Sequence, residues 1–178
     1  MKVDDLGFDL VYKKMIDNEN SLYLIMQALN DGGNISNDDL LWGFKDVAGR
    51  MIGIQSDLIE MCDDTTKKKA SSVFTAMSIN LESGFVGVET ESFGEEIVDN
   101  VKKLYDRLLG VARPIFEGQT LGKNVLLPEL LNIANGMFDA RGEFTSKLPD
   151  SQIKDNKITL LAADKEALNS LFKNVNKR

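Results

Sequence analysis

Histidine is absent from the 178-residue sequence, and cysteine occurs only once. Without histidine the chain cannot build Ser-His-Asp or Cys-His nucleophilic centres, nor the Glu-x-x-His di-iron sites found in some helical bundles. The single cysteine, Cys62, can form no intramolecular disulfide and cannot alone hold an iron–sulfur cluster or a Cys-rich zinc site. It falls among apolar helical positions, so we interpret it as a small core residue. These absences favour a protein without enzymatic activity and without a cofactor.

Long apolar runs and proline are also scarce. No apolar run approaches the roughly 20 residues that cross a bilayer. The N-terminus, MKVDDLGFDL, lacks the positive region and apolar core of a secretory signal. All three prolines follow residue 113, so the first two-thirds of the chain lacks the strongest helix breaker. We expect a cytoplasmic protein that does not contact a membrane.

Charge of one sign dominates each part of the chain. The net charge is −7, with −11 over residues 1–100 and +4 over residues 101–178. An acidic surface argues against direct nucleic-acid binding, which depends on Lys and Arg at phosphates. The asymmetry is typical of an unevenly charged solvated surface, and it also suits a protein partner, such as a basic one.

Helical periodicity is the clearest positive signal, and it is strongest in residues 92–116. Ser92 and Glu95 have capping-box spacing at the start of this stretch. Pro114 predicts a kink or an end of the helix at residues 110–114. The apolar side chains recur in alternating steps of four and three, which predicts a core helix: Ile97, Val101, Leu104, Leu108, Val111 and Ile115.

Similar patterns predict further helices, which together give a single all-α domain over residues 1–178. Glu19 interrupts the first apolar seam, so that element is either two short helices or one bent helix. Ser36 and Asp39 have capping-box spacing at the start of the second. We predict loops at 118–124 and 146–157, the latter flexible, and Pro128 at a first helical position. The predicted elements span about 4–30, 36–62, 70–85, 92–116, 128–144 and 158–175, the last with 158–161 either helical or extended.

These elements favour an irregular bundle of about five to seven helices. The apolar stripes are wider than a coiled-coil seam, which favours packing within one chain, although a homo-oligomer stays open. Gly43, Gly49 and Gly53 interrupt the second helix at about 1 kcal/mol each relative to alanine. Their presence predicts close approach by a neighbouring helix.

Trp42 lies at the margin of the second helix's apolar seam. It is either a core residue or an anchor for a partner, since tryptophan is enriched at binding hot spots. Asp38, Asp39 and Asp46 surround it in the sequence and complete a predicted partner-binding surface. Asp38 and Asp39 also have a purely local explanation, because carboxylates favour the positive end of a helix.

The acidic residues Glu95, Glu96 and Asp99 form the best candidate for a metal site. Helical spacing places them near one another, and Mg²⁺ accepts one or two carboxylates together with substrate phosphates. Two glutamates followed three residues later by an aspartate resemble the helix-borne acidic motif of all-helical nucleotide pyrophosphohydrolases. Asp139 and Glu143 are the nearest substitute for the second acidic motif that such enzymes need. A helix N-terminus also attracts carboxylates without any metal.

Three functional hypotheses follow. The first is a non-enzymatic interaction or regulatory protein that acts through an acidic helical surface on a protein partner, in the manner of a phage or mobile-element accessory or inhibitor protein. The second is a Mg²⁺-dependent hydrolase of nucleotides that uses Glu95, Glu96 and Asp99. The third is a structural subunit of a larger assembly, built on the broad apolar faces.

Overall fold

Four long helices account for most of the residues that the structure, a computed structural model, describes: 5–32, 35–68 and 95–146. The chain turns helical again at 64–68, and no strand occurs within the described ranges. The predicted all-α fold is therefore confirmed. The long helices are α1 (Asp5–Asn30), α2 (Asn37–Glu60), α4 (Glu96–Phe116) and α5 (Lys123–Ser146).

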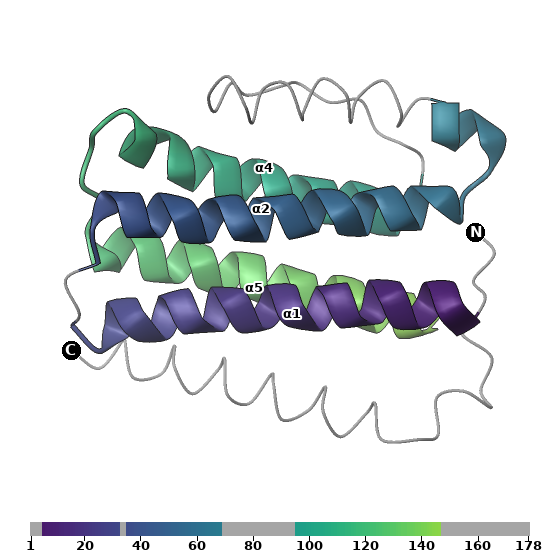
Figure 1. The fold of residues 1–178 in the computed structure, drawn as a ribbon, viewed down its shortest axis with the longest axis horizontal. Helices are drawn as coiled ribbons and strands as arrows, with labels where there is room; N and C mark the ends of the chain where they lie inside the picture. Colours follow the sequence, from purple (N-terminus) through teal and green to yellow (C-terminus); the bar gives the residue numbers. More distant parts are fainter. Residues whose placement is uncertain (1–4, 33–34, 69–94, 147–178) are drawn as a thin grey trace.

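The four helices form a bundle in which each packs against two neighbours. α1 packs on α2 and α5, and α4 packs on the same two helices. Figure 1 shows that consecutive long helices run in opposite directions, so both short connections, α1 to α2 and α4 to α5, lie at one end. At that end Asn37 Nδ2 donates a hydrogen bond of 3.1 Å to the carbonyl oxygen of Gln119. This bond ties the start of α2 to the α4–α5 connection.

α4 is the core helix that its periodicity predicts. Its six seam residues, from Ile97 to Ile115, are all buried. The helix was expected to begin near Ser92, but it begins at Glu96. Glu95 is the N-cap residue, and its side chain makes no capping hydrogen bond. Ser92 lies outside the described residues.

Pro114 predicted a kink or an end of α4 at residues 110–114, and the end is wrong. The helix includes Pro114 and continues to Phe116. Val111, Ala112 and Ile115 are buried against the rest of the bundle. Packing of this last turn outweighs the backbone hydrogen bond that proline cannot make.

α1 is one continuous helix, and Glu19 explains why its seam only looked interrupted. Glu19 is buried and forms an ion pair with Arg141 of α5. The acidic side chain therefore faces the core like its apolar neighbours. α1 ends in a turn where Gly32 adopts a φ of +75°, which glycine tolerates without strain.

The starts of α2 and α5 differ in how far local sequence determined them. The Ser36 cap is confirmed: Ser36 Oγ accepts a hydrogen bond of 3.1 Å from the Asp39 amide. α5 instead begins at Lys123, so the predicted loop ends earlier and Pro128 lies inside the helix. The amides of Val125 and Leu126 already bond to the carbonyl of Gly122 and start the helix ahead of the proline.

The glycines of α2 are only partly explained by close helix packing. A Cβ at Gly43 would lie 3.0 Å from Ile25 Cδ1 of α1, which confirms close approach at this position. A Cβ at Gly49 would meet nothing within 4 Å, and one at Gly53 would meet only Lys14 Nζ, at 3.7 Å. Among the described residues, no helix approaches Gly49 or Gly53 closely, so at these two positions close approach stays a prediction.

Three predicted elements lie outside the described residues: the helix at 70–85, the element at 158–175, and the loop at 146–157 except for Ser146, the last residue of α5. Among the described helices, none combines the length and apolar character needed to cross a membrane.

Candidate functional site

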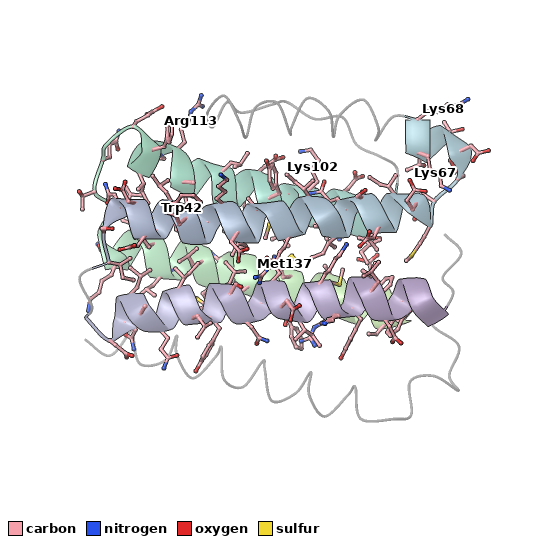
Figure 2. The ribbon with its side chains drawn as sticks, viewed as in Figure 1. Trp42, Lys67, Lys68, Lys102, Arg113 and Met137 are labelled. Carbon is pink, nitrogen blue, oxygen red and sulfur yellow. The ribbon has the colours of Figure 1, made fainter. Side chains whose placement is uncertain are left out.

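The outward face of α2 carries the most unusual side chain of the described surface. Trp42 is 68% exposed, so its interpretation as a core residue is wrong. A helix turns about 100° per residue, which places Trp42 opposite the buried residues Phe44, Met51 and Leu58. Figure 2 labels Trp42 on α2, toward the end of the bundle that holds the short connections. Sequence alone placed Trp42 at the margin of a seam, whereas the structure places it on the far side of the helix.

A hollow of about 560 Å³ lies beside the indole. Gly49 and Gly53 leave its floor without side chains, and cationic side chains stand around it. The lining residues are Lys14, Trp42, Lys45, Asp46, Gly49, Arg50 and Gly53. The hollow thus combines one aromatic side chain with three cations and one carboxylate, on a protein whose net charge is −7.

Contacts within the chain hold the cations of the hollow in place. Lys45 Nζ lies 5.0 Å from the centroid of the Trp42 ring, a cation–π distance. Arg50 Nη2 pairs with Asp46 Oδ2 at 2.8 Å. Lys14 Nζ of α1 pairs with Asp57 Oδ2 at 2.5 Å. The rim of the hollow is therefore largely organised before anything binds.

Arg50 also connects α2 to α1. Its Nη1 donates a hydrogen bond of 2.8 Å to the carbonyl oxygen of Asp17 and a second one to Ser21 Oγ. The guanidinium is fixed in orientation by these partners and by Asp46. The position of this positive charge therefore depends on the packing of α1 against α2.

Three of the four predicted partner-binding residues share the outward face of α2. Asp38, Trp42 and Asp46 are spaced by four residues, which aligns them along one stripe, and all three are exposed. Asp39 is also exposed, but its Oδ2 accepts a hydrogen bond of 2.7 Å from Ser36 Oγ. Asp39 thus has a local role in starting the helix, as its alternative explanation proposed.

The predicted metal residues lie at the other end of the bundle, at the start of α4. Glu95 and Asp99 are half-buried and Glu96 is exposed. Glu143 of α5 comes near this region, since its Oε2 accepts a hydrogen bond of 3.4 Å from Asn100 Nδ2. Within the described ranges, no three acidic or cysteine side chains form a group that could hold a metal ion. The magnesium site stays a prediction.

Cys62 behaves as a core residue. Its side chain is buried and its Sγ donates a hydrogen bond of 3.3 Å to the carbonyl oxygen of Leu58. Burial, together with the negative charge of Glu95, raises the pKa of the thiol above its ordinary value. The thiol is protonated at neutral pH and is a poor nucleophile.

The cations around the hollow escaped sequence-based reasoning. Lys45 and Arg50 had a usable signal, since they follow Trp42 by three and eight residues on the same helix, whereas Lys14 comes from α1. A tryptophan followed seven and eleven residues later by glycines also marks a helix face with a projection and a gap.

Comparison of the chain with protein-family models, curated proteins and solved structures finds no match.

Proposed function

We propose that the protein is a non-enzymatic interaction protein that binds a protein partner through the outward face of α2. The observation that carries this proposal is the exposure of Trp42 beside an open hollow. Tryptophan is enriched among the residues that dominate binding energy, because a large apolar side chain gains much on desolvation.

Charge on the same face indicates what the partner presents. Asp38 and Asp46 flank Trp42 along the stripe, one helical turn to either side. A partner with an apolar pocket for the indole and basic side chains on either side of it matches this pattern. Because charges at the rim of an interface mainly set association rate, the indole supplies most of the affinity and the carboxylates guide the approach.

The scaffold beneath this face favours binding without rearrangement. The opposite side of α2 is buried in the core by Phe44, Met51 and Leu58. Lys45 lies over the Trp42 ring, and this cation–π contact favours one orientation of the indole. A side chain that is already ordered loses little conformational entropy on binding.

Affinity capture with tagged protein tests this proposal at physiological salt. We expect a stoichiometric partner with the wild type and at least a tenfold loss with Trp42→Ala, by analogy with interface hot spots. Val125→Ala is the matched control, because Val125 is 48% exposed and lies on α5, the helix diagonally opposite α2 in the bundle. A partner bound equally by Trp42→Ala, or no stoichiometric partner at all, would contradict the proposal.

A double charge reversal then tests the chemistry of the partner. Asp38→Lys combined with Asp46→Lys should slow association with the captured partner. Both residues are exposed, but Asp46→Lys also breaks the ion pair with Arg50, so circular dichroism must show an unchanged helix content for the comparison to hold. Faster association of this variant would mean that the partner presents acidic side chains.

A further inference from the structure

Trp42 and the glycines of the hollow form a projection and a recess on one face of α2. At a rise of 1.5 Å per residue, Gly49 lies about 10 Å from Trp42 along the helix axis and Gly53 about 16 Å. The indole projects into solvent at one end, and the missing side chains leave a recess at the other. The indole of the same chain lines one side of the recess, so a tryptophan that fills the space over Gly49 and Gly53 comes from another molecule.

Packing within the described chain does not explain the recess. Each helical glycine lowers helix stability relative to alanine. At Gly43 that loss is offset by the close contact with Ile25. Gly49 has open space above it, and Gly53 has only the ammonium group of Lys14 nearby. Something that approaches α2 from outside would use the space that these two glycines leave.

Charge along the same face has a direction. On the N-terminal half of α2, the carboxylates Asp38, Asp39 and Asp46 outnumber the single cation Lys45, which lies over Trp42. Lys14 and Arg50 stand beside the recess, where Lys14 pairs with Asp57. A second α2 laid antiparallel on the first brings the acidic half of each helix over the basic recess of the other. A parallel arrangement would oppose like charges.

We propose that a second copy of this chain docks on α2 in antiparallel orientation, so that Trp42 of each copy fills the recess over Gly49 and Gly53 of the other. The twofold axis then passes near Asp46, where the Asp46–Arg50 ion pairs of the two copies meet and opposite charges alternate. The inference uses the surface of the proposed function, but it does not depend on a different partner. Self-association and partner binding then exclude each other.

The contact is small, because it rests on one helix from each copy. Stable dimers bury more surface than a single helix pair offers, so the association is weak and depends on concentration. Trp42 is the only tryptophan in the chain, so its fluorescence reports burial of this one side chain.

Sedimentation of the full chain over roughly a hundredfold range of concentration tests the inference. We expect a shift from monomer to dimer, accompanied by a blue shift of the tryptophan emission. Trp42→Ala should weaken the dimer at least tenfold, as expected for a central aromatic anchor. Gly49→Leu should weaken it to a similar extent by filling the recess.

A matched substitution controls for the added side chain. Gly110 is an exposed glycine of α4 with open space above it, so Gly110→Leu adds the same leucine elsewhere. An additional exposed leucine promotes association in general, so loss of the dimer in Gly49→Leu alone supports the recess. A monomer at every concentration, or a dimer unaffected by both Trp42→Ala and Gly49→Leu, overturns the inference.

The two proposals fail in different ways. A monomeric protein that still captures a partner through Trp42 overturns the second copy and keeps the proposed function. A Trp42-dependent dimer that captures no partner supports the second copy and contradicts the proposed function.

Discussion

Arg141 Nη2 donates a hydrogen bond of 2.7 Å to Glu19 Oε2 inside the bundle, where Arg141 is 0% and Glu19 3% exposed. The pair joins α5 to α1 across 122 residues of sequence. The guanidinium also lies 5.6 Å from the Tyr12 ring centroid and 5.3 Å from that of Phe138. In a buried ion pair, each charge offsets the free-energy cost of burying the other, so removal of one partner destabilises the folded protein.

Replacing Arg141 alone should therefore be severely destabilising. Arg141→Met leaves the Glu19 carboxylate buried without its partner, and we expect the free energy of unfolding to fall by about 3–5 kcal/mol. Urea denaturation followed by circular dichroism measures this change. The double variant Glu19→Leu and Arg141→Met should recover most of the loss. Arg107→Ala breaks an exposed pair with Glu129 and should cost under about 1 kcal/mol, and equal losses in the two single variants would contradict the argument.

Adding a methyl group at Gly136 should destabilise the α4–α5 packing. A Cβ at this position would overlap the side chain of Leu104, which is itself buried. We expect Gly136→Ala to lower the free energy of unfolding by about 1–3 kcal/mol. At Gly110 the same substitution meets open space and should stabilise α4 by up to about 1 kcal/mol. Thermal unfolding should therefore show a lower melting temperature for Gly136→Ala and a higher one for Gly110→Ala than for the wild type. A rise in melting temperature for both variants would rule out the close contact at Gly136.

The stability of the bundle should fall in alkaline solution because of Tyr105. Burial, with a smaller contribution from the negative charge of Asp106, raises the pKa of Tyr105 to about 12. The phenol ionises near pH 10 in the unfolded chain, so its contribution to stability is complete below about pH 10 and is lost as the pH rises to about 12. That loss amounts to roughly 2–3 kcal/mol. Tyr105→Phe should lack this component, so the measurement is the difference in pH dependence between variant and wild type by urea denaturation.

Divalent cations should leave the melting temperature unchanged. The described residues hold no group of three acidic or cysteine side chains that could bind a metal ion. Differential scanning fluorimetry with Mg²⁺ or Mn²⁺, with and without nucleotides, tests this expectation. A rise in melting temperature that Glu96→Ala and Asp99→Ala abolish, and that Glu129→Ala retains, would contradict this expectation and support the nucleotide hydrolase hypothesis.

Local periodicity was sufficient to predict the helices and one cap. Apolar spacing reports which side of a helix meets the core, so α4 and α2 were recognisable from their seams. The Ser36 cap was equally visible, because its partner Asp39 lies only three residues away. The two prolines predicted helix boundaries wrongly, because Pro114 and Pro128 both lie inside helices. Around Pro114 the buried neighbours, and before Pro128 the earlier backbone hydrogen bonds, outweigh the one amide donor that proline lacks.

Contacts between residues on different helices could not be predicted from the sequence. The polar slot at Glu19 looked like a break in α1 because its partner, Arg141, comes from another helix. Gly43, Gly49 and Gly53 look alike in sequence, yet only the placement of α1 shows that Gly43 alone is in close contact with a neighbouring side chain. For the same reason the exposure of Trp42, on which the candidate site depends, could not be decided before the neighbours of α2 were known.

The order of the helices also sets how the chain can fold. α1 with α2, and α4 with α5, are each joined by a short connection, so each pair forms a helical hairpin from contacts that are local in sequence. Local contacts form early because closing a short loop costs little entropy. The contacts of α1 with α5 close a loop of more than a hundred residues, as the Glu19–Arg141 pair shows. We therefore expect the two hairpins to form before they dock on each other. A shift of one hairpin along the other would separate Glu19 from Arg141 inside the core.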